Sequence, residues 1–146
     1  MTNRYAQWFI SQGVKPQDLV GFYLQNSPDF IFAWLGLWAI GAAPAMINYN
    51  LSGQALLHCL KLSGAKLLLV DADEALAARV SEQSDTLSSE LGMSCATLDQ
   101  DLKKTIYGLE PKRPEDVYRE AVQGDWPMCL FYTRSVDSTS SNGFLY

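Results

Sequence analysis

Residues 19–50, LVGFYLQNSPDFIFAWLGLWAIGAAPAMINYN, decide the fold of this 146-residue chain because three elements follow one another within them. Residues 19–24 form a short run of aliphatic and aromatic residues, which is typical of a strand. Residues 27–40 have the composition of a helix, and residues 45–48 form a second short apolar strand before a polar turn. The sequence therefore predicts a strand, a helix and a strand in this order.

The ends of the predicted helix carry recognisable signals. Ser27 is a favourable N-cap, Pro28 suits the first helical position, and Asp29 interacts well with the positive end of the helix dipole. Gly41, followed by Pro44, supplies a stop. We therefore expect the helix to begin near Ser27 and to end just before Gly41.

The predicted helix is apolar on all sides, and such a helix must be buried on more than one side. Burying its large apolar side chains would contribute about 12–24 kcal/mol in gross terms. We therefore expect other layers of the protein to cover it. These side chains are Phe30, Ile31, Phe32, Trp34, Leu35, Leu37, Trp38 and Ile40.

A membrane span over residues 30–47 is the alternative, because this run carries no charge. A span needs about 20 predominantly apolar residues. The run is shorter, contains Gly36, Gly41 and Pro44, and becomes polar at Asn48. A buried helix that leads into a strand is therefore favoured.

The overall composition indicates one globular domain. With 48% hydrophobic and 12% aromatic residues, the chain has enough apolar surface for a core. Its net charge is -5, and no basic cluster exceeds the pairs Lys103-Lys104 and Lys112-Arg113. We therefore expect no nucleic-acid partner.

The cysteines and the single histidine predict no metal or catalytic site. Cys59, Cys95 and Cys129 are far apart, which gives neither a disulfide framework nor a CxxC motif and favours a reducing compartment with buried free thiols. His58 is interpreted as a packed or surface residue, since one histidine supplies neither a multi-histidine metal site nor a supported Ser/His/Asp triad. No basic leader followed by an apolar run opens the chain, so we expect no secretory signal.

Helical and strand patterns alternate along the chain. Residues 66–72, KLLLVDA, are typical of a strand buried on both faces. Alternating helices and strands indicate right-handed crossovers, so we predict an α/β fold with a partial parallel sheet flanked by helices. The other predicted elements are a helix over 3–12, a helix from Ser52 to Gly64, a helical stripe over 74–91, a strand over 93–98, a short helix or extended link over 99–109 and a strand over 128–133.

Two segments lack these patterns. Residues 110–127 are polar, contain three prolines and are interpreted as a surface connection. Residues 134–146, RSVDSTSSNGFLY, are rich in serine and have no periodicity. We expect them to form a disordered tail with no packed element.

The residues from Leu24 to Asp71 carry a family resemblance. Their sequence, LQNSPDFIFAWLGLWAIGAAPAMINYNLSGQALLHCLKLSGAKLLLVD, resembles the amino-terminal part of an AMP-forming acyl-CoA synthetase of the adenylating superfamily. The chain is most similar to the fatty acid transport protein and very-long-chain acyl-CoA synthetase branch, in its fungal form. The resemblance extends over residues 3–133, is firm over 14–72, and includes GDWPMCLFYT, which leads into the family's ATP loop.

The resemblance implies both a fold and a chemistry. Residues 3–133 would be a partial AMP-binding domain, the amino-terminal part of the large domain of an adenylate-forming enzyme. Such enzymes join a fatty acid to ATP, release pyrophosphate and pass the acyl adenylate to coenzyme A, with Mg²⁺ as the phosphate counter-ion. A loop of the form YTSGTTGxPK holds the phosphates, because its glycines let backbone N–H groups approach them. By this match Tyr132 and Thr133 are the candidate nucleotide-binding residues, and no catalytic or metal-ligating residue is assigned.

The sequence departs from that loop after Thr133. Residues 134–139, RSVDST, stand where Ser-Gly-Thr-Thr-Gly would be, so both glycines are missing and Asp137 would repel phosphate. We therefore expect this chain to be an internal slice of a longer ligase that has no activity of its own and binds no ATP, Mg²⁺ or coenzyme A. A frame shift or a retained intron after the Thr133 codon would give such a sequence.

Other functions stay open. The chain could be a non-catalytic binding or regulatory module that pairs with a full-length relative through uncovered faces of the helix over 30–40. It could also be a small membrane-associated protein anchored through residues 30–47. The resemblance implies fatty acid and coenzyme A as partners of the family, and an intracellular, membrane-associated location at the endoplasmic reticulum, peroxisome or plasma membrane.

Overall fold

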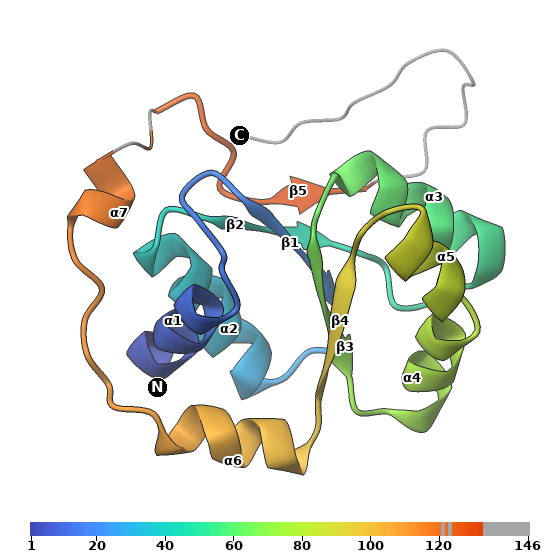
Figure 1. The fold of residues 1–146 in the computed structure, drawn as a ribbon, viewed down its shortest axis with the longest axis horizontal. Helices are drawn as coiled ribbons and strands as arrows, with labels where there is room; N and C mark the ends of the chain where they lie inside the picture. Colours follow the sequence, from blue (N-terminus) through green and yellow to red (C-terminus); the bar gives the residue numbers. More distant parts are fainter. Residues whose placement is uncertain (121, 123, 133–146) are drawn as a thin grey trace.

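A computed structural model describes residues 1–120, 122 and 124–132 of the chain. Within these residues, five parallel strands form one sheet in the order β4-β3-β1-β2-β5 (Figure 1). The predicted α/β fold with a parallel sheet is confirmed. The strands are β1 (Leu19–Tyr23), β2 (Ala43–Met46), β3 (Leu67–Asp71), β4 (Ser94–Leu98) and β5 (Leu130–Phe131). The helices are α1 (Thr2–Ser11), α2 (Pro28–Ala39), α3 (Gly53–Ser63), α4 (Glu74–Ser81), α5 (Ser84–Ser89), α6 (Gln100–Gly108) and α7 (Val117–Glu120).

The strand order explains why helices lie on both faces of the sheet. The connection from β1 to β2 moves across the sheet in one direction, whereas those from β2 to β3 and from β3 to β4 move in the opposite direction. Because parallel crossovers are right-handed, a reversed direction puts the connecting helix on the other face. Accordingly α2 packs with α1 and α6 on one face, and α3, α4 and α5 cover the other (Figure 1).

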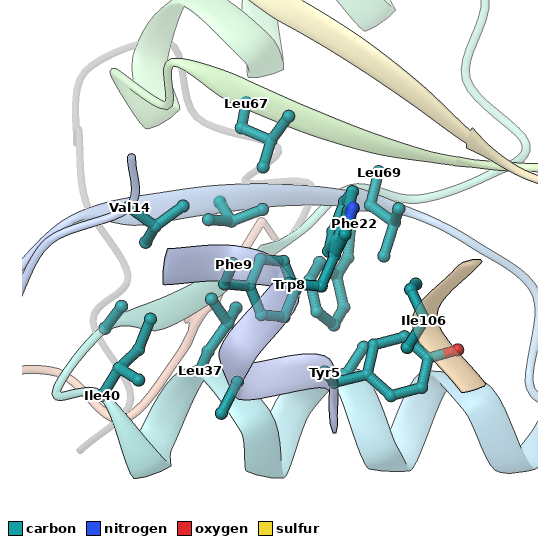
Figure 2. Packing of buried hydrophobic residues seen from close by; sticks show 14 of the residues in the cluster. Tyr5, Trp8, Phe9, Val14, Phe22, Leu37, Ile40, Leu67, Leu69 and Ile106 are labelled. Atoms are coloured by element: carbon teal, nitrogen blue, oxygen red, sulfur yellow. The ribbon is translucent and has the colours of Figure 1, made fainter. Parts of the chain in front are cut away.

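The face toward α1 and α2 holds an aromatic core. Tyr5 and Phe9 of α1 are fully buried, and they gather with Leu37 of α2 and Phe22 of β1 in one cluster (Figure 2). The ring of Trp8 lies 5.0 Å from that of Phe9. The aromatic residues of the first helix therefore fill the space between α2 and the sheet.

Strand β3 is buried on both faces, as its sequence predicts. Leu67 and Leu69 belong to the cluster under α1 and α2, whereas Leu68 and Val70 belong to the cluster under α3, α4 and α5. The two sets alternate because successive side chains of a strand point to opposite faces. A strand in this position requires an uninterrupted apolar run, which KLLLVDA supplies.

Helix α2 begins at the predicted cap but is less completely covered than predicted. The Ser27 side chain accepts a hydrogen bond from the Phe30 backbone N–H at 3.2 Å. Leu37 is fully buried, whereas Ile31 and Leu35 are 48% and 40% exposed. Among the described residues, α1 and the sheet cover part of this helix, as expected, but Ile31 and Leu35 are left exposed, against the expectation that its large apolar side chains are all covered. No helix in the described part of the chain has the length and apolarity that a membrane crossing requires.

Strand β2 begins earlier than predicted and includes Pro44, which the sequence suggested as a helix stop. Proline lacks an N–H group and is normally excluded from an inner strand. Here the Ile47 N–H donates to the Phe22 carbonyl on the β1 side at 2.9 Å. Alternate residues of a strand face opposite neighbours, so the nitrogen of Pro44 faces β5, where pairing starts only at Ala45. The proline therefore breaks no hydrogen bond of the sheet.

Several segments refine or correct the predictions. Ser52 occupies the N-cap position of α3, but its side chain makes no capping hydrogen bond. The helical stripe over 74–91 is two helices, α4 and α5, and the helical alternative for residues 99–109 is confirmed by α6. The connection over 110–127 contains the short helix α7, and only two residues of the predicted strand over 128–133 are in β5.

Gly36 allows α1 and α2 to approach each other closely. A Cβ atom added at Gly36 would lie 2.8 Å from the Cβ of Tyr5, 3.0 Å from the backbone nitrogen of Ala6 and 3.2 Å from the carbonyl oxygen of Thr2. Backbone atoms cannot move aside as the end of a flexible side chain can. The glycine within the apolar run is therefore explained by helix contact.

Replacing Gly36 with alanine should destabilise the protein. Overpacking against α1 would cost about 1–3 kcal/mol, against a gain of about 1 kcal/mol from the higher helix propensity of alanine. We therefore expect Gly36→Ala to lower the free energy of unfolding, measured by urea denaturation, by up to about 2 kcal/mol. Gly108→Ala is the matched control, because a Cβ added there meets no atom within 4 Å. Equal stability of the two variants would contradict the close crossing.

Candidate functional site

The carboxyl edge of the parallel sheet is the candidate site, because ligands of open α/β sheets bind outside the carboxyl ends of the strands. The segments that follow β1, β2, β3 and β4 meet at this edge, and β5 ends there too. The polar groups on this edge that are free to meet a ligand therefore decide what the chain can do.

Asp71 closes the part of this edge between β1 and β3. Its two carboxylate oxygens accept hydrogen bonds from the backbone N–H groups of Gln25 and Asp73, at 2.9 and 3.0 Å. Close by, the Tyr23 hydroxyl donates to the Leu51 carbonyl at 2.6 Å. These groups tie the loops to one another, so their role is structural.

A buried carboxylate holds the start of α2. Asp29 is 7% exposed. Its Oδ1 accepts hydrogen bonds from the hydroxyls of Tyr5 and Tyr107, at 2.7 and 2.5 Å, and its Oδ2 lies 3.1 Å from Nζ of Lys103. Because the donors belong to α1 and α6, this one side chain joins three helices.

The contacts of Asp29 also set the charges of the cluster. Burial alone would raise the pKa of Asp29, but hydrogen bonds from Tyr107, Tyr5 and Lys103, with the charge of Lys103, hold that pKa below its usual value. Burial and the hydrogen bond to Asp29 raise the pKa of Tyr107 to about 12, and they raise the pKa of Tyr5 as well. At neutral pH the cluster is a carboxylate between two neutral phenols and a lysine. It offers no free group to a ligand.

Of the two site residues predicted from the sequence, Tyr132 is described, and Thr133 lies outside the described residues. Strand β5 pairs with β2, Phe131 beside Met46, so Tyr132 follows the carboxyl end of the outer strand. Its side chain is partly buried and packs against the cluster under α3. Burial raises the pKa of its hydroxyl to about 12, with Ser63 opposing the rise.

A groove at the amino end of β2 was not indicated by the sequence. It has a volume of about 350 Å³ and lies between the end of α2 and the segment before β5. Its charged residue, Arg119, is engaged, since Nη1 donates to the Ala39 carbonyl at 3.1 Å and Nη2 pairs with Asp116. The groove is therefore apolar in character. Its lining residues are Trp38, Gly41, Ala42, Arg119, Val122, Trp126, Pro127 and Met128.

The sequence could have signalled this groove only weakly. The polar composition of residues 110–127 favours a surface connection, although Trp126 and Pro127 are followed by the apolar Met128. The sequence does not show that the end of α2 lies opposite these three residues. Trp38 Nε1 donates to the Met128 carbonyl at 2.7 Å, a contact across 90 positions of the chain.

The histidine and the cysteines show no sign of catalysis. His58 is exposed on α3, in agreement with its interpretation as a packed or surface residue. The expectation of buried free thiols is wrong, since Cys95 is exposed and Cys59 and Cys129 are half-buried. Partial desolvation nevertheless raises the pKa of all three thiols, which lowers their thiolate fraction. Among the described residues, no group of three His, Cys, Asp or Glu side chains is arranged to hold a metal ion.

Comparisons with known proteins agree on one family. The family described as AMP-binding enzyme matches residues 1–134. The chain is 44% identical over 84 residues to isopenicillin N epimerase component 1 of Hapsidospora chrysogena, and 36% identical over 95 residues to long-chain fatty acid transport protein 1 of Rattus norvegicus. These matches cover 58% and 65% of this chain but 14% of each relative, so the chain spans about a seventh of their length.

A solved structure has the same fold. The inhibitor-bound N-terminal domain of FACL13 from Mycobacterium tuberculosis superposes with a TM-score of 0.76 and 20% sequence identity. The match covers 92% of this chain and 32% of that domain. The sheet and its helices therefore correspond to about a third of a larger domain.

Removing the Asp29 carboxylate should destabilise the protein in a pH-dependent way. Asp29→Asn leaves Lys103 unpaired and gives both tyrosines a weaker acceptor, which should lower the free energy of unfolding by about 1–3 kcal/mol at pH 7. Because the pKa of Asp29 is lowered on folding, its stabilisation is present above about pH 4 and is lost as the pH falls through the folded-state pKa. The difference in the free energy of unfolding between the wild type and the variant, measured by urea denaturation over this range, should therefore decrease as the pH falls.

Asp101→Asn is the matched control for this experiment. The Asp101 side chain is 91% exposed and pairs with Lys104 at the surface, where an ion pair contributes little. The free energy of unfolding of the Asp101→Asn variant should equal that of the wild type at every pH. An Asp29→Asn protein as stable as the wild type at pH 7 would show that the cluster does not hold the helices together.

Proposed function

The chain belongs to the AMP-binding enzyme family, and we propose that it supplies the amino-terminal part of the adenylating domain of an ATP-dependent fatty acid–CoA ligase. In such a ligase the fatty carboxylate attacks the α-phosphorus of ATP and pyrophosphate leaves. The coenzyme A thiol then attacks the acyl carbonyl, and AMP leaves. The fatty-acid substrate is proposed because the rat relative is named for the transport of long-chain fatty acids.

The observation that carries this proposal is the position of Tyr132 at the carboxyl end of β5. Nucleotide-binding loops of open α/β sheets follow strands at this edge. The family match also ends here, at residue 134. Tyr132 and Thr133 would therefore open the nucleotide loop, with Tyr132 anchored in the core and Thr133 as a phosphate contact.

We propose that the described residues alone do not bind ATP, Mg²⁺ or coenzyme A. The aspartates at the carboxyl edge are engaged within the protein. Asp29 and Asp71 hold helices and loops, whereas Asp73 and Asp99 accept hydrogen bonds from the first turns of α4 and α6. Each of these four carboxylates holds part of the protein, which supports the proposal that the chemistry of the family comes from groups elsewhere in a complete domain.

The sequence beyond β5 supports the proposal that this chain is inactive alone. Residues 134–139 contain no glycine that could bring backbone N–H groups to a phosphate, and they include Asp137. We therefore propose that residues 3–133 form a partial AMP-binding domain and that residues 134–146 contribute nothing to a phosphate site.

The proposal extends to location and to a second function. A long-chain substrate partitions into lipid, so we propose that the complete ligase acts at an intracellular membrane, of the endoplasmic reticulum, peroxisome or plasma membrane.

The second candidate function is that of a non-catalytic module that pairs with a full-length relative. The exposed Ile31 and Leu35 of α2 favour this candidate.

A pair of hybrids with the rat relative tests the proposed function. In the first, residues 1–133 of this chain replace the equivalent segment and the relative keeps its own loop. In the second, residues 1–139 replace it, so that RSVDST stands in place of the loop. We expect the first to make fatty acyl-CoA and the second to be slower by at least about 100-fold, because the N–H donors of the loop are gone.

The 146-residue chain itself should give no ATP–pyrophosphate exchange with long-chain fatty acids. Robust exchange by this chain, or ligase activity of the second hybrid, would refute the proposed inactivity. A first hybrid that folds, as judged by circular dichroism and cooperative unfolding, but makes no acyl-CoA would contradict the ligase assignment.

A further inference from the structure

The turn that follows β2 lies beside the proposed nucleotide site. Strands β2 and β5 run side by side in the same direction, with Met46 beside Phe131 (Figure 1). The next residues of the two strands, Ile47 and Tyr132, both pack on the α3 face of the sheet, so they lie at the same level. Asn48 follows Ile47 in the sequence. It therefore lies at the carboxyl edge, one residue beyond the level of Tyr132.

The backbone of the turn over residues 48–51 is held from two sides. Within the turn, the Leu51 N–H donates to the Asn48 carbonyl at 3.0 Å. The Tyr23 hydroxyl of β1 donates to the Leu51 carbonyl at 2.6 Å, and Arg79 Nη1 of α4 donates to the Tyr49 carbonyl at 2.8 Å. A side chain on this turn therefore needs little further ordering when a ligand binds, which reduces the entropic cost of the contact.

The side chain of Asn48 is oriented as well. Its Oδ1 accepts a hydrogen bond from the Asn50 backbone N–H at 2.9 Å. A carboxamide carries an acceptor oxygen and a donor nitrogen, so a bond that uses the oxygen turns Nδ2 away from the backbone. Asn48 is exposed, and within the described residues its Nδ2 meets no acceptor. It therefore presents a fixed hydrogen-bond donor at the carboxyl edge.

The position of Asn48 separates it from the other polar groups of this edge. The carboxylate of Asp71 and the hydroxyl of Tyr23 are engaged by the loops. Asn26, which follows β1, is also exposed, but β2 lies between β1 and β5. Neighbouring strands are about 4.8 Å apart. Asn48, on the strand next to β5, is therefore one strand closer than Asn26 to the site that Tyr132 would open.

A fixed amide donor suits an anionic oxygen. Hydrogen bonds to ionised acceptors such as phosphate oxygens are shorter and stronger than those between neutral groups. We propose that Asn48 Nδ2 donates a hydrogen bond to a phosphate oxygen of the nucleotide, from the side of the site that β2 supplies. This inference rests on the proposed function for the presence of a nucleotide at this edge.

Asn48→Asp in the first hybrid, which keeps the loop of the rat relative, tests the inference. Aspartate retains the oxygen that accepts the Asn50 N–H, and with it the turn, but it removes the donor and adds a negative charge. We expect the Kd for ATP, measured by isothermal titration calorimetry, to rise by at least about tenfold. The affinity for adenosine, which has no phosphate, and the temperature of unfolding should not change.

Asn48→Ala separates a phosphate contact from support of the turn. Alanine removes both the donor and the acceptor of the turn but adds no charge, so it should weaken ATP binding less than aspartate does. A side chain that only supported the turn would give the reverse order, with aspartate harmless, and this order would overturn the inference.

Asn26→Asp is the matched control, because it adds the same charge at an exposed asparagine of the same edge. The Kd for ATP should stay that of the unmodified hybrid. A loss as large as that with Asn48→Asp would show a general effect of charge at the edge and would also overturn the inference.

Binding and ligation together distinguish failure of this inference from failure of the proposed function. A hybrid that binds ATP with the expected dependence on Asn48 but makes no acyl-CoA would contradict the ligase function and support the phosphate contact. A hybrid that makes acyl-CoA and binds ATP equally well with Asn48→Asp would overturn the contact and support the ligase function. A folded hybrid that binds no ATP would overturn both.

Discussion

The helical layer on one face of the sheet depends on the burial of a single carboxylate. Asp29 is stabilised at the positive end of the α2 dipole, but its burial is tolerable only because donors meet both of its oxygens. Those donors come from distant parts of the chain, Tyr5 on α1 and Lys103 and Tyr107 on α6. The position of α2 therefore determines where both other helices must lie, and the Arg4 Nε donation to the Leu109 carbonyl at 2.9 Å extends this link.

The position of α2 also determines the packing above the strands β1 and β3. Helix α2 follows β1, and Gly36 brings α1 close enough for the aromatic side chains of α1 to fill the space above β1 and β3. Asp71 then closes the loops between these two strands. Polar groups on this part of the edge are used to hold structure, in keeping with the proposal that a nucleotide site lies at the carboxyl end of β5.

The sequence predicts elements whose causes are local and misses those whose causes lie elsewhere in the chain. The start of α2 is a capping signal within four residues, and β3 is an uninterrupted apolar run, so both are predictable. The tolerance of Pro44 depends on where β5 begins to pair, and the need for Gly36 depends on α1. Asp29 is recognisable in the sequence as a favourable first-turn residue, but its burial depends on α6, which the sequence left open as a helix or a link.

The candidate site divides in the same way. A local motif indicates Tyr132 and Thr133, whereas the groove combines residues about 90 positions apart. These two regions nevertheless belong to one sheet. Met128 of the groove precedes β5, and Tyr132 follows its carboxyl end, where ligands of open α/β sheets bind. The position of one short strand therefore determines where both the groove and the proposed nucleotide site lie, and that position depends on the pairing of β5 with β2 rather than on any local pattern.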